Sequence, residues 1–120
     1  MTHEWTPATY RIARRERDTE LAGEICGVFG VGPSVDLSFG DWWQVTHLPT
    51  GGAVGPPFPT PVQARRFAEE LAALRDDWAD IPMDHRFNPV FRAEVGRLAR
   101  RILRAQANAT NDEIHAGGSR

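Results

Sequence analysis

The stretch from Trp42 to Gln63 constrains the fold of this chain more than any other. It begins with aromatic and β-branched residues, which favour a strand, and then passes through a corner rich in glycine and proline. Thr60 suits an N-cap, Pro61 suits the first helical position because its missing N–H is not needed there, and Gln63 completes a capping box. The chain is therefore expected to change from strands to helices at this corner.

Length and composition predict a single domain. With 120 residues, 41% of them hydrophobic, the chain can bury a core of its own but is too short for two. No apolar run approaches the roughly 20 residues of a membrane helix, no secretory signal opens the chain, and the lone cysteine fits a reducing compartment. We expect a cytoplasmic domain over residues 1–106 and a flexible tail over residues 107–120, where apolar periodicity stops.

An antiparallel meander of three to four strands is expected before the corner, because apolar residues alternate with polar ones between turn signals. The glycines of the second expected strand, residues 21–31, predict that this strand is strongly bent. Residues 1–8, which precede the first strand, could dock through the indole of Trp5. A short edge at residues 53–55 could follow, ended by Pro56-Pro57. The expected strands cover residues 9–17, 21–31, 35–39 and 42–48.

Two amphipathic helices are expected after the corner. The first carries apolar residues at spacings of three and four as far as Trp78 and ends near Asp80. The second begins at Asn88-Pro89, and its stripe could pack in the core or pair with a second copy of the chain, which leaves a homodimer open. The sequence thus predicts an α+β domain with two C-terminal helices, the first packed on the sheet. The stripe of the second helix comprises Phe91, Val95, Leu98 and Ile102.

Arginines give the second helix a charge that the whole chain does not share. The net charge is −2, yet residues 86–104 hold six arginines and one acidic residue. Four of these arginines lie broadly opposite the apolar stripe, where they could meet an acidic protein surface or a row of phosphates. Alternatively, they form a solvated face paired with acidic residues of the preceding helix, which would add little stability. The four are Arg97, Arg100, Arg101 and Arg104.

The adjacent indoles of Trp42 and Trp43 form the second candidate site. Neighbouring side chains of a strand point to opposite faces, so the two cannot enter the same core. The indole left outside could anchor a partner protein or stack on bases, or it could be covered by Trp5, the tail or a helix.

Other residues that could carry chemistry do not form a recognisable constellation. The histidines are scattered without metal-ligand spacing, and a nucleophilic pair of Cys26 and His47 lacks an orienting group. The glycines of residues 27–32 do not form a phosphate-binding loop, and the aspartates around residues 76–84 lack the spacing of a calcium loop. We therefore expect no enzyme activity, no metal and no cofactor. A small hydrolase or a ligand-binding pocket remains as a third hypothesis, after protein binding and nucleic-acid binding.

The run W-x-V-T-H-x-P-T-G from Trp43 to Gly51, with the F-x-T and A-R-x-F-A residues that follow it, resembles short uncharacterised proteins of actinobacterial phages and mobile elements. The resemblance covers about a quarter of the chain. It implies a strand-turn-helix unit in a small accessory protein and carries over no catalytic residues. We therefore expect a non-enzymatic protein that binds another protein, with nucleic-acid binding through the arginine helix as the alternative.

Overall fold

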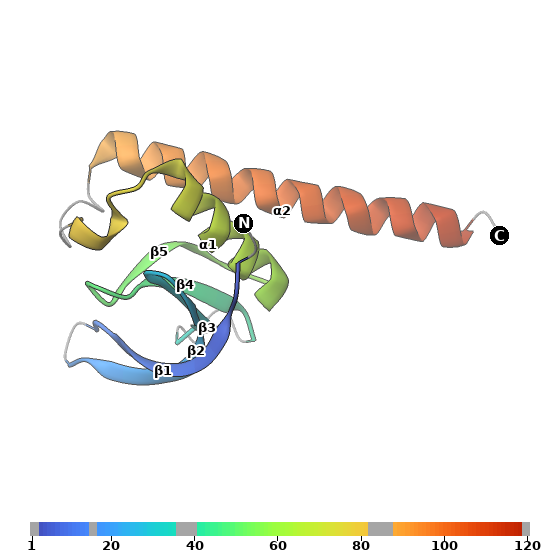
Figure 1. Cartoon of the computed structure of the whole chain (residues 1–120). Helices are drawn as coiled ribbons and strands as arrows, with labels where there is room; N and C mark the ends of the chain where they lie inside the picture. The colour runs from blue at the N-terminus through green and yellow to red at the C-terminus, as the bar shows by residue number, and fades with distance from the viewer. Residues whose placement is uncertain (1–2, 15–16, 36–40, 82–87, 119–120) are drawn as a thin grey trace.

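The computed structural model describes residues 3–14, 17–35, 41–81 and 88–118, with side chains described as far as Ala105. Five strands pair in chain order as an antiparallel meander, and the helices follow them, which confirms the predicted α+β class (Figure 1). Over the described residues, the strands number five rather than three to four. The strands are β1 (Thr6–Ile12), β2 (Thr19–Cys26), β3 (Phe29–Pro33), β4 (Trp43–His47) and β5 (Gly52–Phe58). They are followed by α1 (Pro61–Leu74), the short 3-10 helix η2 (Trp78–Asp80) and α2 (Pro89–Gly118).

The predicted bent strand over residues 21–31 is wrong, because the structure divides it into the β2–β3 hairpin. Gly27 lies in the turn with a φ of 60°, a left-handed conformation that glycine adopts without a steric cost. Apolar residues continue through the turn, and this continuity concealed the reversal. The strand predicted at residues 35–39 falls almost wholly outside the described residues.

β5 continues through Pro56-Pro57, where the sequence predicted that pairing would stop. Val45 pairs with Val54 and Trp43 with Phe58, so three residues of β5 bulge opposite the single residue Gln44. The Gln44 side-chain amide donates hydrogen bonds to the carbonyl oxygens of Gly55 at 3.0 Å and Val54 at 3.4 Å. The prolines lie inside the bulge, where their missing N–H groups interrupt no ladder pair, and Gln44 donates to two neighbouring carbonyls.

Both predicted helix starts are confirmed. Thr60 Oγ1 accepts a hydrogen bond from the Gln63 N–H at 3.2 Å, and Asn88 Oδ1 accepts from the N–H groups of Val90 and Phe91. The end of the first helix was predicted too late. α1 ends at Leu74, whose side chain is 45% exposed rather than part of the core.

The helices lie together on one face of the sheet, and a single apolar core joins them to it (Figure 1). α1 packs on β3, β4 and β5, while α2 packs on β5 and α1. The stripe of α2 is buried within the chain, with Phe91 at 8% exposure and Ile102 at 3%. The predicted alternative in which this stripe pairs two subunits is therefore wrong.

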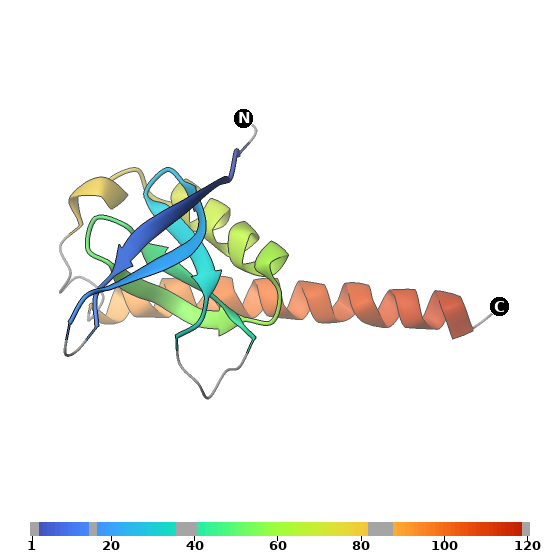
Figure 2. The ribbon, with the colours of Figure 1, turned by 90° about the horizontal axis from the view of Figure 1, so that it is seen from below.

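α2 extends well past the rest of the molecule (Figure 2). Its backbone is helical through Gly118, whereas the sequence predicted a tail without regular structure from residue 107. Residues 105–116 contain no proline or glycine, so nothing local stops the helix once the core has started it.

The β1–β2 hairpin lies at the sheet edge opposite β5, and the start of β1 runs toward α1, to which contacts distant in sequence tie the hairpin (Figure 1). Trp5 Nε1 donates to Glu69 Oε2 at 2.8 Å, which confirms that this indole docks. Arg65 pairs with Glu24 at 2.8 Å. At the other end of β1, the Ala13 N–H donates to the Gly51 carbonyl at 2.8 Å.

The single tyrosine, Tyr10, supplies a pH-dependent test of this packing. Its side chain is 8% exposed, and burial raises its pKa to about 12, an effect that contact with Thr46 opposes only in part. Ultraviolet titration should show ionisation near pH 12 in the folded protein and near pH 10 in denaturant. The unfolded chain loses this proton first, so stability should be level below pH 10 and fall from there to pH 12. Native ionisation near pH 10 would contradict the burial.

Candidate functional site

The arginines of α2 point in three directions. At about 100° per residue, Arg97, Arg100 and Arg104 cluster on the side opposite the buried stripe, and all three are exposed. Arg101 lies on the flank toward α1, and Arg92 lies on the flank toward β5. We call the first three the outer arginine ridge.

Arg101 is the member of the predicted arginine face that forms the intramolecular pair considered above. Its Nη2 lies 3.0 Å from Glu70 Oε2, and Glu70 also lies 4.0 Å from Arg66. The Arg101 side chain is 69% exposed, so this pair adds little stability. In the part of the chain that the structure describes, the outer arginine ridge forms no ion pair.

The two adjacent tryptophans differ in environment, as expected. Trp43 opens β4, pairs with Phe58 and packs against the core. Trp42 precedes the strand, accepts a backbone hydrogen bond from Ser34, and is 38% exposed. Trp42 is therefore the accessible indole, and it lies on a different element from the ridge.

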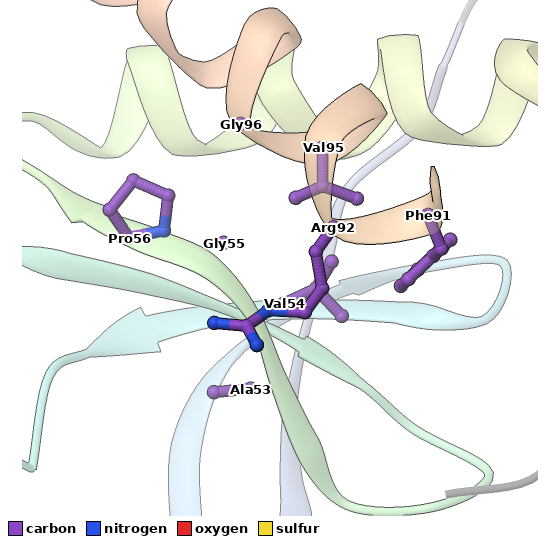
Figure 3. A pocket seen from close by; sticks show the side chains of 8 residues that line it. All are labelled: Ala53, Val54, Gly55, Pro56, Phe91, Arg92, Val95 and Gly96. Carbon is purple, nitrogen blue, oxygen red and sulfur yellow. The ribbon is translucent and has the colours of Figure 1, made fainter. Parts of the chain in front are cut away.

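A cleft of about 350 Å³ lies between β5 and the first turns of α2, and the sequence did not predict it (Figure 3). Val54, Phe91 and Val95 give it apolar walls. The side chain of Arg92 reaches from α2 past Val54 toward Ala53. Gly96 was the available signal, because a glycine inside a helix costs about 1 kcal/mol relative to alanine and leaves a position on the helix surface without a side chain.

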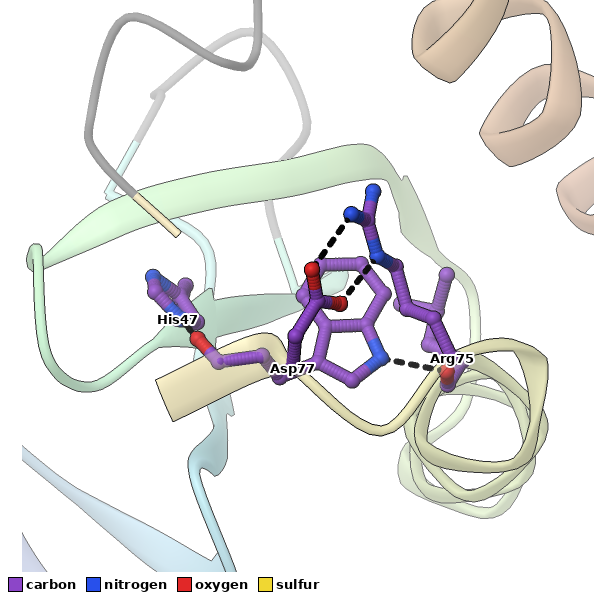
Figure 4. Close-up of polar contacts among 5 residues, drawn as sticks. His47, Arg75 and Asp77 are labelled. Carbon is purple, nitrogen blue, oxygen red and sulfur yellow. Dashed lines mark hydrogen bonds and ion pairs between the residues drawn. The ribbon is translucent and has the colours of Figure 1, made fainter. Parts of the chain in front are cut away.

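His47 and Trp78 form buried hydrogen bonds that have a structural role. His47 is 4% exposed; its Nε2 donates to the Trp78 carbonyl at 2.6 Å, and its Nδ1 lies 2.8 Å from Thr50 Oγ1 (Figure 4). Trp78 Nε1 in turn donates to the Leu71 carbonyl at 2.6 Å. These bonds fasten the β4–β5 turn to η2 and the end of α1.

Arg75 covers this group from outside. Its guanidinium lies 5.9 Å from the ring centroids of both Trp78 and Phe91, within the range of a cation–π interaction. Two hydrogen bonds to Asp77, of 2.5 and 2.8 Å, raise the pKa of Arg75 above its ordinary value (Figure 4). Within the W-x-V-T-H-x-P-T-G run, Trp43 therefore packs against the core, and His47 and Thr50 hold the β4–β5 turn in place.

The remaining candidates do not converge on a reactive site. Both ring nitrogens of His47 have partners, and β3 lies between its strand and that of Cys26. The described residues contain no group of three or more side chains that could hold a metal ion. Over the same residues, no helix is long and apolar enough to cross a membrane.

The chain was compared with family models, curated proteins and solved structures. No protein-family model, curated protein or solved structure matches it at a significant level. The features of the molecule that bear on function are the exposed arginines, Trp42 and the cleft.

Proposed function

We propose that this protein is non-enzymatic and acts by binding another protein through the outer arginine ridge, with Trp42 as an apolar anchor. The observation that carries the proposal is the ridge itself, three exposed arginines without an ion pair in the described part of the chain. Guanidinium groups held in a row on a rigid helix suit the carboxylates of an acidic partner surface. Arginine and tryptophan are also the residue types that most often dominate binding energy at interfaces.

Nucleic-acid binding is the alternative, and charge favours a protein partner. The ridge offers three cations over about 10 Å of helix, on a chain whose net charge is −2. Glu69 lies on the adjacent helix and would repel a phosphate backbone that followed α2, while Glu70 already occupies Arg101. The resemblance to phage and mobile-element proteins supports the further proposal that the bound partner is a host factor whose activity this protein modulates.

Charge reversal on the ridge tests this proposal. Quantitative mass spectrometry should compare proteins captured from nuclease-treated native lysate by the wild type, by Arg97→Glu/Arg104→Glu, and by a control, Arg14→Glu/Arg17→Glu. All four arginines are exposed, so both variants should unfold at the wild-type denaturant midpoint. At least one partner should fall about tenfold with the ridge variant alone, because a lost charge pair costs about 1.4 kcal/mol or more.

Three outcomes separate the alternatives. A partner set unaffected by the ridge variant would overturn the proposed surface. Ridge-dependent capture from a parallel lysate without nuclease but not from the treated one, together with duplex DNA affinity that falls steeply with salt, would establish the nucleic-acid alternative. Trp42→Ala should weaken the ridge-dependent partner further, and an unchanged affinity would remove the indole from the interface.

A further inference from the structure

The cleft between β5 and α2 combines a free sheet edge with a helix wall (Figure 3). β5 is the last strand of the sheet, and the described chain pairs with it only on the β4 side. Residues 53–56 of this strand line the cleft. An unpaired strand edge offers backbone donors and acceptors to another extended chain, and a neighbouring helix can select that chain's side chains.

Two glycines keep the cleft open. Gly55 has a φ of 71°, and a Cβ there would lie 2.6 Å from the Phe67 ring and 3.4 Å from Val95, a residue of the cleft, so a side chain would crowd this wall. On the helix wall, a Cβ at Gly96 would approach only Arg100 Nη1, at 3.4 Å, which leaves the space in front of Gly96 unfilled. The apolar side chains of Val54, Phe91 and Val95 surround this space.

Arg92 gives the cleft its charge preference. The guanidinium extends across the cleft to the strand side, beside Val54 and Ala53 (Figure 3). Within the described residues it forms no ion pair and no side-chain hydrogen bond. A cation beside an apolar cavity suits a ligand that places a carboxylate next to an apolar group.

We propose that this cleft binds an extended acidic segment of another protein as an added strand along β5. The segment pairs with the backbone beside Ala53, inserts one apolar side chain into the cleft and places a carboxylate on Arg92. The pairing is short, because the Gly52 N–H is bonded to Thr50 and the carbonyls of Val54 and Gly55 are bonded to Gln44, and because Pro56 has no N–H. Arg92 lies about a third of a turn from the outer arginine ridge, so this is a second site, and it can fail without the first.

Peptide libraries test the proposal on the full-length chain. The probes are acetylated and amidated hexapeptides with a fixed Val-Asp pair and varied flanks, and a matched library with Val-Asn. Backbone amide NMR shifts locate binding, and fluorescence anisotropy measures affinity. The Val-Asp library should shift the amides of residues 52–55 and 91–96. Arg92→Gln should weaken its binding about tenfold, whereas Arg97→Gln, on the outer ridge, should leave it unchanged.

A steric variant removes the concern that a charge change acts at a distance. Gly96→Leu should fill the cleft and abolish binding, while the gain in helix propensity keeps α2 intact. Gly96→Ala adds only one methyl group and should retain measurable binding.

The contrary results are distinct. Absence of shifts with both libraries, equal binding of the Val-Asn library, unchanged binding to Arg92→Gln, or shifts confined to the outer ridge would each overturn the proposal. If 3-phenylpropionate gave the same shifts with the same affinity, the site would bind organic acids rather than an added strand. If the chain self-associated through β5 and excluded the peptides, the occupant would be a second copy. None of these results bears on ridge-dependent capture.

Discussion

Replacing Trp78 by alanine should lower the free energy of unfolding by about 3–5 kcal/mol, as for other large buried aromatic residues. The indole is 4% exposed, and its ring lies 5.0 Å from Phe29, 5.5 Å from Phe91 and 6.0 Å from His47. Alanine would leave a cavity among these rings and would remove the donor to the Leu71 carbonyl. Guanidinium denaturation followed by circular dichroism measures the loss.

Two variants divide the Trp78 effect into packing and hydrogen bonding. Trp78→Phe retains an aromatic ring but leaves the Leu71 carbonyl without its donor, and should cost about 1–3 kcal/mol. Leu74→Ala is the control, because Leu74 shares the predicted stripe yet is 45% exposed. It should change stability by less than about 0.5 kcal/mol. Equal losses for Trp78→Ala and Leu74→Ala would contradict the place of Trp78 in the core.

Gly55→Ala should be the next most damaging substitution, with a loss of about 2–5 kcal/mol. A left-handed conformation costs a residue with a Cβ about 1–2 kcal/mol, and overpacking a core costs about 1–3 kcal/mol more. Both terms apply, because Gly55 has a φ of 71° and its added methyl group would meet the buried ring of Phe67 at 2.6 Å. The same denaturation experiment measures the change.

Gly27→Ala is the matched control for this prediction. Gly27 has a similar φ of 60°, but a Cβ there meets no atom within 4 Å. It should therefore lose only the conformational term, about 1–2 kcal/mol. If Gly27→Ala and Gly55→Ala cost the same, the close approach of β5 to Phe67 would be refuted.

Features fixed by local chemistry were predictable from the sequence. The caps at Thr60 and Asn88 depend on residues within one helical turn, and both formed as expected. Where tertiary packing decided, prediction failed. The apolar pattern of residues 21–31 continues through the turn at Gly27, and β5 passes Pro56-Pro57 in a bulge opposite Gln44 of the neighbouring strand.

The candidate site was predicted only in outline. Helical periodicity correctly placed four arginines away from the buried stripe, but a single helix cannot reveal what packs on its flanks. In the structure, Arg101 pairs with Glu70 of α1. Arg92, which the sequence did not single out, lies on the flank of α2 that faces β5. The cleft requires the edge strand and the helix together, and these elements are far apart in the chain.

The ties that hold the β1–β2 hairpin have a consequence for synthesis. Trp5 must reach Glu69, Glu24 must reach Arg65, and Ala13 must reach Gly51, so each contact closes a long loop. The strands themselves pair with their neighbours in the chain, but these three contacts must overcome the entropy of loop closure. During synthesis, the contacts of Trp5 and Glu24 can therefore form only after α1 has left the ribosome, although the hairpin that they hold is made first.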